Sequence, residues 1–284
     1  MVVVKLEGGM GNQLFQYAAG RYLAQKLNAE LKLDIDIYTT ENKRQYALHH
    51  FNVQEVFSKA RERKNLKRKE FFRRQLNKLG ADLKSYWYTE QIPGYDINVE
   101  KLTDNVFLEG FWQSEKYFKP IESTIRKEFI VKDQPSALNR KYLDEIRSVN
   151  SISIHVRRGD YVTDKETNAV HGVCDLEYYR KAIDRMSTEI NDPRFYIFSD
   201  DMKWTKENIS SSIHPFAYSA HNQAAPHEDL RLMYSCKHHI IANSSFSWWG
   251  AWLNMNTEKK VIAPRNWFRT LENRDIIPTG WLTL

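Results

Sequence analysis

The second half of this sequence alternates short apolar runs with amphipathic stretches, and this alternation restricts the fold more than any other feature. Runs typical of buried strands occur near residues 151–156, 194–199, 213–217, 238–243 and 260–263, with helical patterns between them. Strands that alternate with helices predict a mostly parallel, doubly wound α/β sheet. In such a sheet the carboxyl ends of the strands share one edge, and ligands bind there.

Polar segments follow four of these predicted strands, so we expect them to meet in one crevice at that edge. They are RRGDY after Val156, SDD after Phe198, the loop Ser219–Asn222 and NSSFSWW after Ala242. Ser244 and Ser245 precede a helix rich in tryptophan, where they can cap the helix or offer hydroxyl and N–H donors to a phosphate.

The most concentrated chemistry lies in Ile154–Tyr161, where an apolar strand ends in two arginines, a glycine and an aspartate. Guanidinium groups are permanently charged, planar donors that match phosphate oxygens. Arg157 and Arg158 are therefore candidates for a phosphate clamp. The alternative is a solvated loop in which one of these arginines only pairs with Asp160.

The N-terminal stretch predicts a βα unit with a glycine-rich turn. A strand at Val2–Leu6 is followed by GGMGNQ and by a helix at Gln13–Leu27. The bare backbone N–H groups of such a turn suit an anion, and Asn12 either caps the helix or reaches the ligand.

A nicotinamide-dependent oxidoreductase is the main alternative for this βα unit. A second strand predicted at Leu31–Ile35 carries Asp34 about where a ribose ligand would stand in such an enzyme. However, Leu14 occupies the position of the third glycine in the dinucleotide pattern G-x-G-x-x-G.

The segment Ser58–Lys84 is strongly basic, and KARERKNLKRKEFFRR carries nine Lys or Arg against two Glu. An apolar stripe accompanies these charges and comprises Phe71, Phe72, Leu76 and Leu79. The pattern fits an amphipathic helix on an anionic membrane surface, and it also fits the solvated outer face of a packed helix.

Trp112 and Gln113 follow a predicted strand at Val106–Phe111, and a helix is expected from Ser114 to about Phe129. An aromatic face beside a polar amide suits a sugar ring, so both residues are acceptor candidates. A core contact is the alternative for Trp112.

Composition narrows the class of protein. The 284 residues suggest two domains, which we place at 1–150 and 151–284, and the formal net charge of +6 favours an anionic partner. Two distant cysteines argue against a disulfide framework or a zinc site and favour a reducing compartment. No apolar run is long enough to span a bilayer and no signal peptide is evident, so a soluble or peripheral protein is expected.

Four segments together resemble the bacterial α-1,2-fucosyltransferases, which share an HxRRGD element with α-1,6- and protein O-fucosyltransferases. They are LEGGMGNQLFQYAAGRYLA, HVRRGDY, FSDD and DLRLMYSCKHHIIANSSFSWWGAWL, and the similarity runs from about Lys5 to Ile262. The resemblance implies a GT-B-like α/β architecture in which two Rossmann-like domains face a central cleft. GDP-fucose would be held mainly by the C-terminal domain, with the acceptor on the N-terminal side.

The resemblance also implies roles for individual residues. Arg157 would contact the β-phosphate, His155 would lie near the nucleoside and Asp229 would read the guanine edge. The other implied donor-binding residues are Gly11, Asn12, Gln13, Arg158, Asp200, Ser244, Ser245 and Phe246. Asp229 also begins a predicted helix, so a simple cap is its alternative role.

The chemistry agrees with these roles. Cleavage of the bond between fucose and GDP leaves charge on the β-phosphate, which a fixed Arg157 guanidinium would stabilise in the transition state. The acceptor hydroxyl must also lose a proton. Asp160, Asp164, Glu166 and His171 are candidates for the base, and among them we select Asp160, with assistance by the phosphate as the alternative.

We therefore expect an inverting transfer of L-fucose from GDP-β-L-fucose to the 2-hydroxyl of a terminal β-galactose, for surface polysaccharide synthesis in the cytoplasm. No metal is expected, because Asp200 and Asp201 are adjacent and would point apart on an extended strand. No nucleic acid partner is expected, and contact with an anionic inner membrane remains open. Besides the oxidoreductase, a non-catalytic nucleotide or glycan binder is an alternative, but a binder needs no arginine aimed at a leaving phosphate.

Overall fold

A computed structural model describes residues 1–40, 44–210, 214–272 and 274–284. The chain divides into two compact units, each with its own parallel sheet. Unit 1 comprises Met1–Ile130 and Arg274–Ile276, and unit 2 comprises Val131–Asn273 and Ile277–Leu284.

The domain boundary predicted at residue 150 lies too far along the chain. Helix α5 (Ala137–Ser148) belongs to unit 2, because its Leu143 and Ile146 pack in one buried cluster with Tyr196 and Leu232 of that unit. The polar connector before this helix, rather than the residues after it, therefore separates the units.

Unit 1 is built on a four-stranded sheet in the order β2-β1-β4-β3, with all three strand pairs parallel. Its strands are β1 (Val2–Lys5), β2 (Leu31–Asp34), β3 (Trp87–Thr89) and β4 (Val106–Glu109). Its helices are α1 (Met10–Lys26), α2 (Asp36–Thr40), α3 (Ala60–Lys78) and α4 (Glu122–Glu128), and its 3-10 helices are η1 (Leu48–His50), η2 (Ile97–Lys101), η3 (Glu115–Tyr117) and η4 (Lys119–Ile121).

Helix α1 packs closely on strand β1. Val2, Val3 and Val4 are fully buried, as expected for an inner strand of a parallel sheet. Gly20 permits the close approach, because a Cβ atom there would lie 3.0 Å from the side chain of Val4. The helix begins at Met10, three residues before the predicted start at Gln13, so the glycine-rich turn contributes its first turn.

The helix predicted from Ser114 to about Phe129 is broken into shorter pieces. Two 3-10 turns, η3 and η4, precede α4. Pro120 accounts for the interruption, since proline lacks an N–H donor and disfavours helical geometry in the residue before it.

Unit 2 contains a six-stranded, fully parallel sheet in the order β10-β9-β8-β5-β6-β7, as the alternation of strands and helices predicts. Its strands are β5 (Asn150–Val156), β6 (Pro193–Ser199), β7 (Phe216–Ser219), β8 (His238–Ile240), β9 (Val261–Ala263) and β10 (Leu282–Thr283). Its remaining helices are α6 (Gly159–Thr163), α7 (Lys165–His171), α8 (Leu176–Glu189), α9 (Met202–Asn208), α10 (Pro226–Ser235) and α11 (Ser245–Leu253). The strand predicted at 213–217 is observed slightly later, and residue 213 lies outside the described residues.

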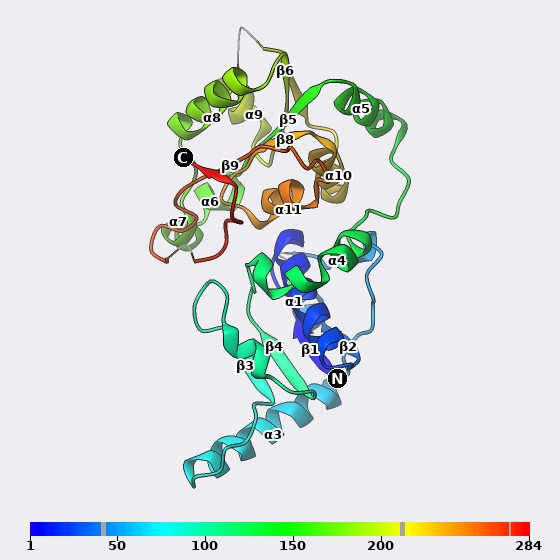
Figure 1. The fold of residues 1–284 in the computed structure, drawn as a ribbon, viewed down its shortest axis with the longest axis vertical. Coiled ribbons are helices and arrows are strands. Elements are labelled where there is room, and N and C mark those ends of the chain that lie inside the picture. The colour runs from blue at the N-terminus through cyan, green and yellow to red at the C-terminus, as the bar shows by residue number, and fades with distance from the viewer. Residues whose placement is uncertain (41–43, 211–213, 273) are drawn as a thin grey trace. The chain divides into compact units, whose positions relative to one another are not determined.

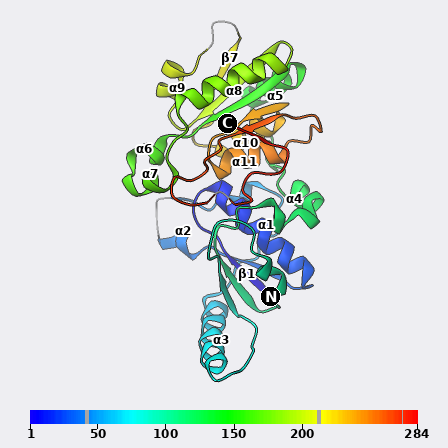
Figure 2. The same ribbon diagram turned by 60° about the vertical axis from the view of Figure 1, so that its left-hand side comes forward.

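Helices cover both faces of the unit 2 sheet (Figures 1 and 2). Alternate residues of β6 point to opposite faces: Phe195 and Ile197 pack with α8, whereas Tyr196 and Phe198 pack with α5 and α10. The sheet is thus doubly wound, and only its strand ends and loops are open to ligands. Among the described residues, no helix is long and apolar enough to cross a membrane.

Candidate functional site

The polar segments of unit 2 meet at the carboxyl edge of its sheet, as predicted. Val156 of β5 lies beside Ser199 of β6, so the segments after both strands emerge together. The backbone N–H of Arg158 donates to Asp200 Oδ1 at 2.8 Å, and the Tyr161 hydroxyl donates to the carbonyl oxygen of Asn243 at 3.3 Å. These bonds join the segments that follow β5, β6 and β8.

Arg157 lies at the centre of this edge between two carboxylates. Its Nη2 is 2.5 Å from Asp160 Oδ1, and its Nη1 is 2.7 Å from Asp200 Oδ2. Its guanidinium carbon also lies 5.1 Å from the centre of the Tyr161 ring. The ion pair between Arg157 and Asp160, which was the alternative to a phosphate clamp, is therefore present. Asp200 supplies a second carboxylate to the same guanidinium.

The Nε–H donor of Arg157 is buried and has no hydrogen-bond partner among the described residues. Buried polar groups are nearly always paired, so an unpaired donor is a place where a ligand or water is expected. Arg157 is thus held by its two terminal nitrogens, while its Nε–H has no partner among the described residues.

Arg158 does not share a clamp with Arg157 in this structure. Its guanidinium carbon lies 3.7 Å from the centre of the Trp204 ring, and its Nε is 3.3 Å from Asp201 Oδ2. Asp201 also caps α9 by accepting the backbone N–H of Trp204. Arg158 therefore anchors its segment to α9, and its contact with a phosphate stays a prediction.

Gly159 allows Asp200 to approach the segment closely. A Cβ atom at this position would lie 2.5 Å from Asp200 Oδ2, the oxygen that faces Arg157. The glycine of RRGDY is therefore explained by packing against the neighbouring loop rather than by a positive φ angle.

His155 and Phe246, both assigned to donor binding, lie together. Their ring centres are 5.6 Å apart, and His155 Nδ1 is buried and unpaired among the described residues. Burial, with a smaller contribution from the charge of Arg157, lowers the pKa of His155 to about 3. The imidazole is therefore neutral near pH 7 and acts through hydrogen bonds and stacking rather than through charge.

Asp229 connects two elements and is not a helix cap. It is the fourth residue of α10, and its Oδ1 accepts hydrogen bonds from Ser219 Oγ at 2.8 Å and Asn222 Nδ2 at 2.9 Å. Burial raises the pKa of its carboxyl group, and the two hydrogen bonds oppose that effect. The carboxylate is thus fixed in orientation beside the loop that follows β7.

Ser244 is the N-cap residue of α11, but its side chain makes no capping hydrogen bond. It is buried with extended backbone geometry, and its carbonyl oxygen accepts the N–H of Trp248 at 3.0 Å. Capping of α11 by the side chain therefore does not explain why a serine occupies position 244. Ser245 follows as the first residue of the helix.

The candidates in unit 1 fall into two groups. Asn12 Oδ1 accepts a hydrogen bond from Gln113 Nε2 at 2.9 Å, which joins the start of α1 to the segment after β4. Gly8 has a φ of 77°, and a Cβ atom there would lie 2.7 Å from Asn12 Nδ2. Gly11 is buried in the first turn of α1. Contact of Asn12 or Gly11 with a donor, and of Gln113 with an acceptor, stays a prediction.

Two unit 1 candidates belong to the core instead. Trp112 is 0% exposed and packs edge-on against Tyr117 at 5.5 Å between ring centres, so it cannot present a face to a sugar. Gln13 is also 0% exposed. Its Nε2 donates to the carbonyl oxygens of Gly8 and Gln45, and its Oε1 accepts the N–H of Ala47. The amide of Gln13 therefore binds backbone groups of the protein rather than the nucleotide-sugar donor.

Two side chains that support the site were not singled out from the sequence. Asn243 Nδ2 donates to the carbonyl oxygens of His171 at 2.9 Å and Trp267 at 3.2 Å. Tyr161 stacks on His171 with 4.8 Å between ring centres. Asn243 and Tyr161 each lie in a polar segment that follows a strand, and this position was the sequence feature that could have indicated them. Their contacts could not be predicted, because the partners lie elsewhere in the sequence.

The base candidates are also distinguished by their contacts. Asp164 caps α7 by accepting the N–H of Thr167 at 2.9 Å, and burial lowers the pKa of His171. Asp160 is the candidate that directly contacts Arg157.

Two units, each with a parallel sheet, are typical of a GT-B-like α/β fold. Among solved structures, a mutant of Arabidopsis thaliana FUT1 in complex with GDP shares this fold, with a TM-score of 0.50 and 10% identity over 94% of this chain and 71% of that chain.

The sequence comparisons define the family. The model of glycosyl transferase family 11 matches residues 1–284, and the chain belongs to that family. It is 34% identical to an Escherichia coli alpha-1,2-colitosyltransferase, over 100% of this chain and 99% of the relative. It is 30% identical to the Escherichia coli O-antigen biosynthesis glycosyltransferase WbnK, over 98% of this chain and 99% of the relative.

Family membership confirms the resemblance to fucosyltransferases and excludes the oxidoreductase alternative. The structure agrees, because Leu14 is buried in the core and the Asp34 carboxylate lies 3.3 Å from Arg63 Nη1. A glycosyltransferase is likewise favoured over a non-catalytic binder.

Proposed function

We propose that this enzyme transfers L-fucose from GDP-β-L-fucose to the 2-hydroxyl of a terminal β-galactose, with inversion at the anomeric carbon. Membership of family 11 and the four fucosyltransferase-like segments support the reaction class. The observation that carries the proposal is the buried Nε–H of Arg157 at the carboxyl edge of the unit 2 sheet, for which the described part of the chain offers no hydrogen-bond partner.

Arg157 is suited to a leaving diphosphate. Departure of GDP places charge on the β-phosphate while the sugar acquires oxocarbenium character, so a guanidinium fixed beforehand stabilises the transition state more than the bound donor. Asp200 supplies that fixation from the neighbouring strand. A diphosphate bound to Nε and Nη2 would take the place of Asp160 on the guanidinium.

Release of Asp160 would provide the general base. The Oδ1 of Asp160 is paired with Arg157, and the Asp160 side chain is 35% exposed against 27% for Asp200, so Asp160 is the easier partner to displace. A freed carboxylate beside the diphosphate could accept the proton of the attacking hydroxyl. Donor binding and activation of the acceptor would then be coupled.

The other donor contacts follow from the site. We assign Ser244 and Ser245 to the pyrophosphate, because the hydroxyl of Ser244 is not used as a helix cap. We assign His155 and Phe246 to the nucleoside and sugar, and Asp229 to guanine N1 and N2, which are hydrogen-bond donors.

Colitose is a second candidate for the transferred sugar. The 34% identical relative is named as an alpha-1,2-colitosyltransferase and is matched along its whole length. Colitose is fucose without one ring hydroxyl, so the two donors would share the diphosphate and nucleoside contacts. The binding of the two donors would differ only at the residues next to the hydroxyl that colitose lacks. A site that hydrogen-bonds this hydroxyl of fucose would reject colitose.

The decisive experiment is to incubate the purified protein with a panel of nucleotide sugars and lactose, and to assign the product linkage by NMR. We expect an α-1,2-linked product from GDP-fucose, and the ratio of kcat/KM for GDP-fucose and GDP-colitose will identify the preferred donor. Transfer from a uridine nucleotide sugar alone, or a product linked elsewhere on galactose, would contradict the proposal.

The biological setting is also a proposal. One relative is named for O-antigen biosynthesis, which supports a role in surface polysaccharide synthesis. We propose that the enzyme acts in the cytoplasm, where nucleotide sugars are made, and that it needs no divalent metal. Expression followed by cell fractionation tests the location.

A further inference from the structure

The exposed side of α3 carries basic and apolar residues but no carboxylate. Its exposed basic residues are Arg61, Lys64, Lys67, Arg68, Lys69, Arg74 and Lys78. Its large apolar residues are exposed too, with Phe71 at 59%, Phe72 at 57% and Leu76 at 47%, and Leu79 directly after the helix is 85% exposed. We call this set of residues the α3 face.

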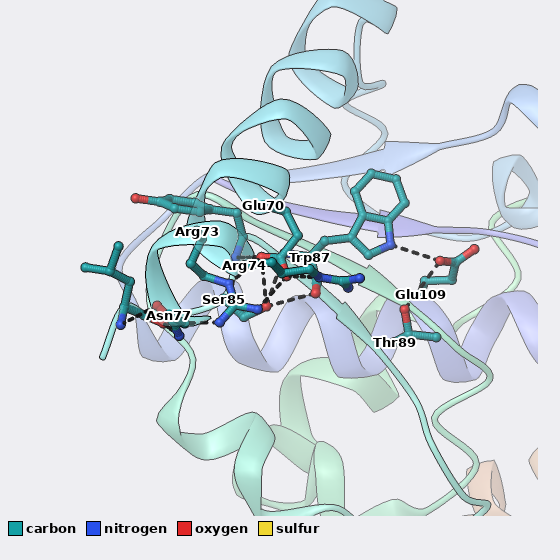
Figure 3. A network of polar contacts seen from close by, with 10 residues as sticks. Glu70, Arg73, Arg74, Asn77, Ser85, Trp87, Thr89 and Glu109 are labelled. Atoms are coloured by element: carbon teal, nitrogen blue, oxygen red, sulfur yellow. Dashed lines mark hydrogen bonds and ion pairs between the residues drawn. The ribbon is translucent and has the colours of Figure 1, made fainter. Parts of the chain in front are cut away.

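Both glutamates of α3 are turned inward and paired. Glu62 lies 2.6 Å from Lys32 Nζ and accepts the backbone N–H of Lys59. Glu70 is 4% exposed and accepts hydrogen bonds from Arg73, Arg74 and the backbone N–H of Tyr86 (Figure 3). The acidic residues are thus used to attach the helix, and of the exposed basic residues only Arg74 pairs with a carboxylate among the described residues.

The same attachments fix which side of α3 faces outward. Leu66 is buried against Val3 and Phe107 of the sheet, one turn before Glu70. Arg73 Nη1 and Asn77 Nδ2 each donate to the carbonyl oxygen of Leu83 at 3.3 Å, which holds the returning loop against the inner side. In both views the C-terminal half of α3 extends beyond the sheet of unit 1, accompanied by this loop (Figures 1 and 2).

The α3 face has the chemistry of a membrane-surface helix. Lys and Arg side chains are attracted to anionic headgroups, and Phe and Leu side chains on the same side enter the boundary between headgroups and acyl chains. We propose that the α3 face docks unit 1 on a membrane surface that contains anionic phospholipids. This inference does not depend on which sugar the enzyme transfers.

Lipid is favoured over nucleic acid because of the apolar residues. A phosphodiester backbone would satisfy the cations alone, whereas Leu76 and Leu79 cannot stack on bases and would stay in water. The rings of Phe71 and Phe72 contact each other edge-on at 5.7 Å between centres and form a single apolar protrusion. The loop after the helix adds an exposed carboxylate, Asp82, beside Leu83 and Lys84.

The test is co-sedimentation of the whole enzyme with vesicles of phosphatidylcholine alone or with phosphatidylglycerol added. We expect binding to the mixed vesicles that weakens as salt is raised, and little binding to phosphatidylcholine. Each basic residue near an anionic surface contributes roughly a fivefold factor in affinity. Lys64→Glu with Arg68→Glu should therefore weaken binding by at least about tenfold, and Phe71→Ser with Phe72→Ser should also weaken it at high salt.

Helix α5 provides matched controls in unit 2. Arg140→Glu with Lys141→Glu makes the same change in charge on another exposed helix, and Leu138→Ser removes an exposed apolar residue there. These variants should bind vesicles as the wild type does. Normal transfer to a soluble acceptor will show that each α3 variant is folded.

Three outcomes would overturn the proposal. The first is an equal loss of vesicle binding in the α5 and α3 variants, which would indicate an effect of net charge. The second is vesicle binding by the wild type that the α3 substitutions leave unchanged. The third is tight binding of a DNA or RNA oligonucleotide through Lys64 and Arg68 in a protein that ignores vesicles, which would assign the α3 face to nucleic acid.

Discussion

Asp229 links the start of α10 to the loop after β7 through Oδ1, and this fixed carboxylate leads to a prediction at the residue scale. If it reads guanine, Asp229→Ala should weaken GDP binding without weakening inorganic pyrophosphate binding. A hydrogen bond to a charged group contributes roughly 1.5–3 kcal/mol, or about ten- to a hundredfold in affinity. Calorimetry with both ligands measures the difference.

The control for Asp229 is Ser219→Ala, which removes one of its internal hydrogen bonds and keeps the carboxylate. We expect a smaller loss of GDP affinity from this change. If GDP and pyrophosphate lose affinity equally in Asp229→Ala, the residue orders the loop and does not contact the base.

Gly159 gives a second prediction at this scale. In Gly159→Ala the new Cβ would lie 2.5 Å from Asp200 Oδ2, so Asp200 must move away from Arg157. Because Arg157 then loses its fixation, we expect at least about a tenfold fall in kcat. Steady-state kinetics and a melting curve check this, and unchanged turnover in the alanine variant would show that Asp200 does not position the arginine.

Single residues were predictable from the sequence where a strand end determined their place. Arg157, Asp160 and Asp200 follow strands whose apolar runs were clear, so their meeting could be expected. The directions of other side chains depend on tertiary neighbours. Trp112 turns into the core through a backbone with a φ of 55°, and Arg158 finds the Trp204 ring.

At the scale of elements, Glu70 attaches α3 to the sheet of unit 1, and its replacement gives a third prediction. Although burial opposes ionisation, hydrogen bonds from Arg73, Arg74 and the Tyr86 N–H lower the pKa of Glu70 from 4.5 to about 2. A lowering of this size corresponds to roughly 3–4 kcal/mol, and solvent screening at the exposed Arg74 side chain reduces the expected contribution to roughly 2–3 kcal/mol. We expect Glu70→Gln to reduce the free energy of unfolding by about that amount at pH 7.

The sign of the pH dependence follows from the lowered pKa. The contribution of Glu70 is fully present above its unfolded pKa, near 4.5, and is lost as the pH falls towards 2. The difference between wild type and Glu70→Gln should therefore shrink over that range in urea unfolding. Glu207→Gln, at an exposed position of α9, is the control for loss of one carboxylate. A difference that is independent of pH would exclude the ionised network as its cause.

Elements were predictable where their apolar pattern was long. Strands β5, β6, β8 and β9 of unit 2 agree with the sequence pattern because most of their residues are buried. Short edge strands carry little pattern, and β3 and β10 were not anticipated. Pro120 by itself predicts a break before α4, but the spacing of the apolar residues around it favoured a single helix.

At the scale of the whole molecule, metal independence is the fourth prediction. Asp200 faces Arg157 and the Arg158 N–H, whereas Asp201 caps α9 and contacts the Arg158 side chain, so the two carboxylates serve different partners. Arg157 and helix N-termini are expected to neutralise the diphosphate. Transfer should persist in excess EDTA after metal stripping. Loss of turnover in EDTA with recovery in magnesium or manganese would show that a cation carries that charge.

The two-unit organisation was predictable from length and from the two βα patterns, but the boundary was not. The α5 sequence fits a helix in either unit, and only its packing with Tyr196 and Leu232 assigns it to unit 2.

The central claim is that Arg157 stabilises charge on the leaving diphosphate, and the turnover of Arg157→Ala tests it most directly. Loss of a transition-state charge contact should cost about 3 kcal/mol or more, so kcat/KM should fall at least about a hundredfold. Arg157→Lys should also be poor, because an ammonium lacks the planar set of donors. Arg194→Ala, which removes a surface ion pair with Glu145, serves as the control. Near-normal transfer by a folded Arg157→Ala enzyme would contradict the account.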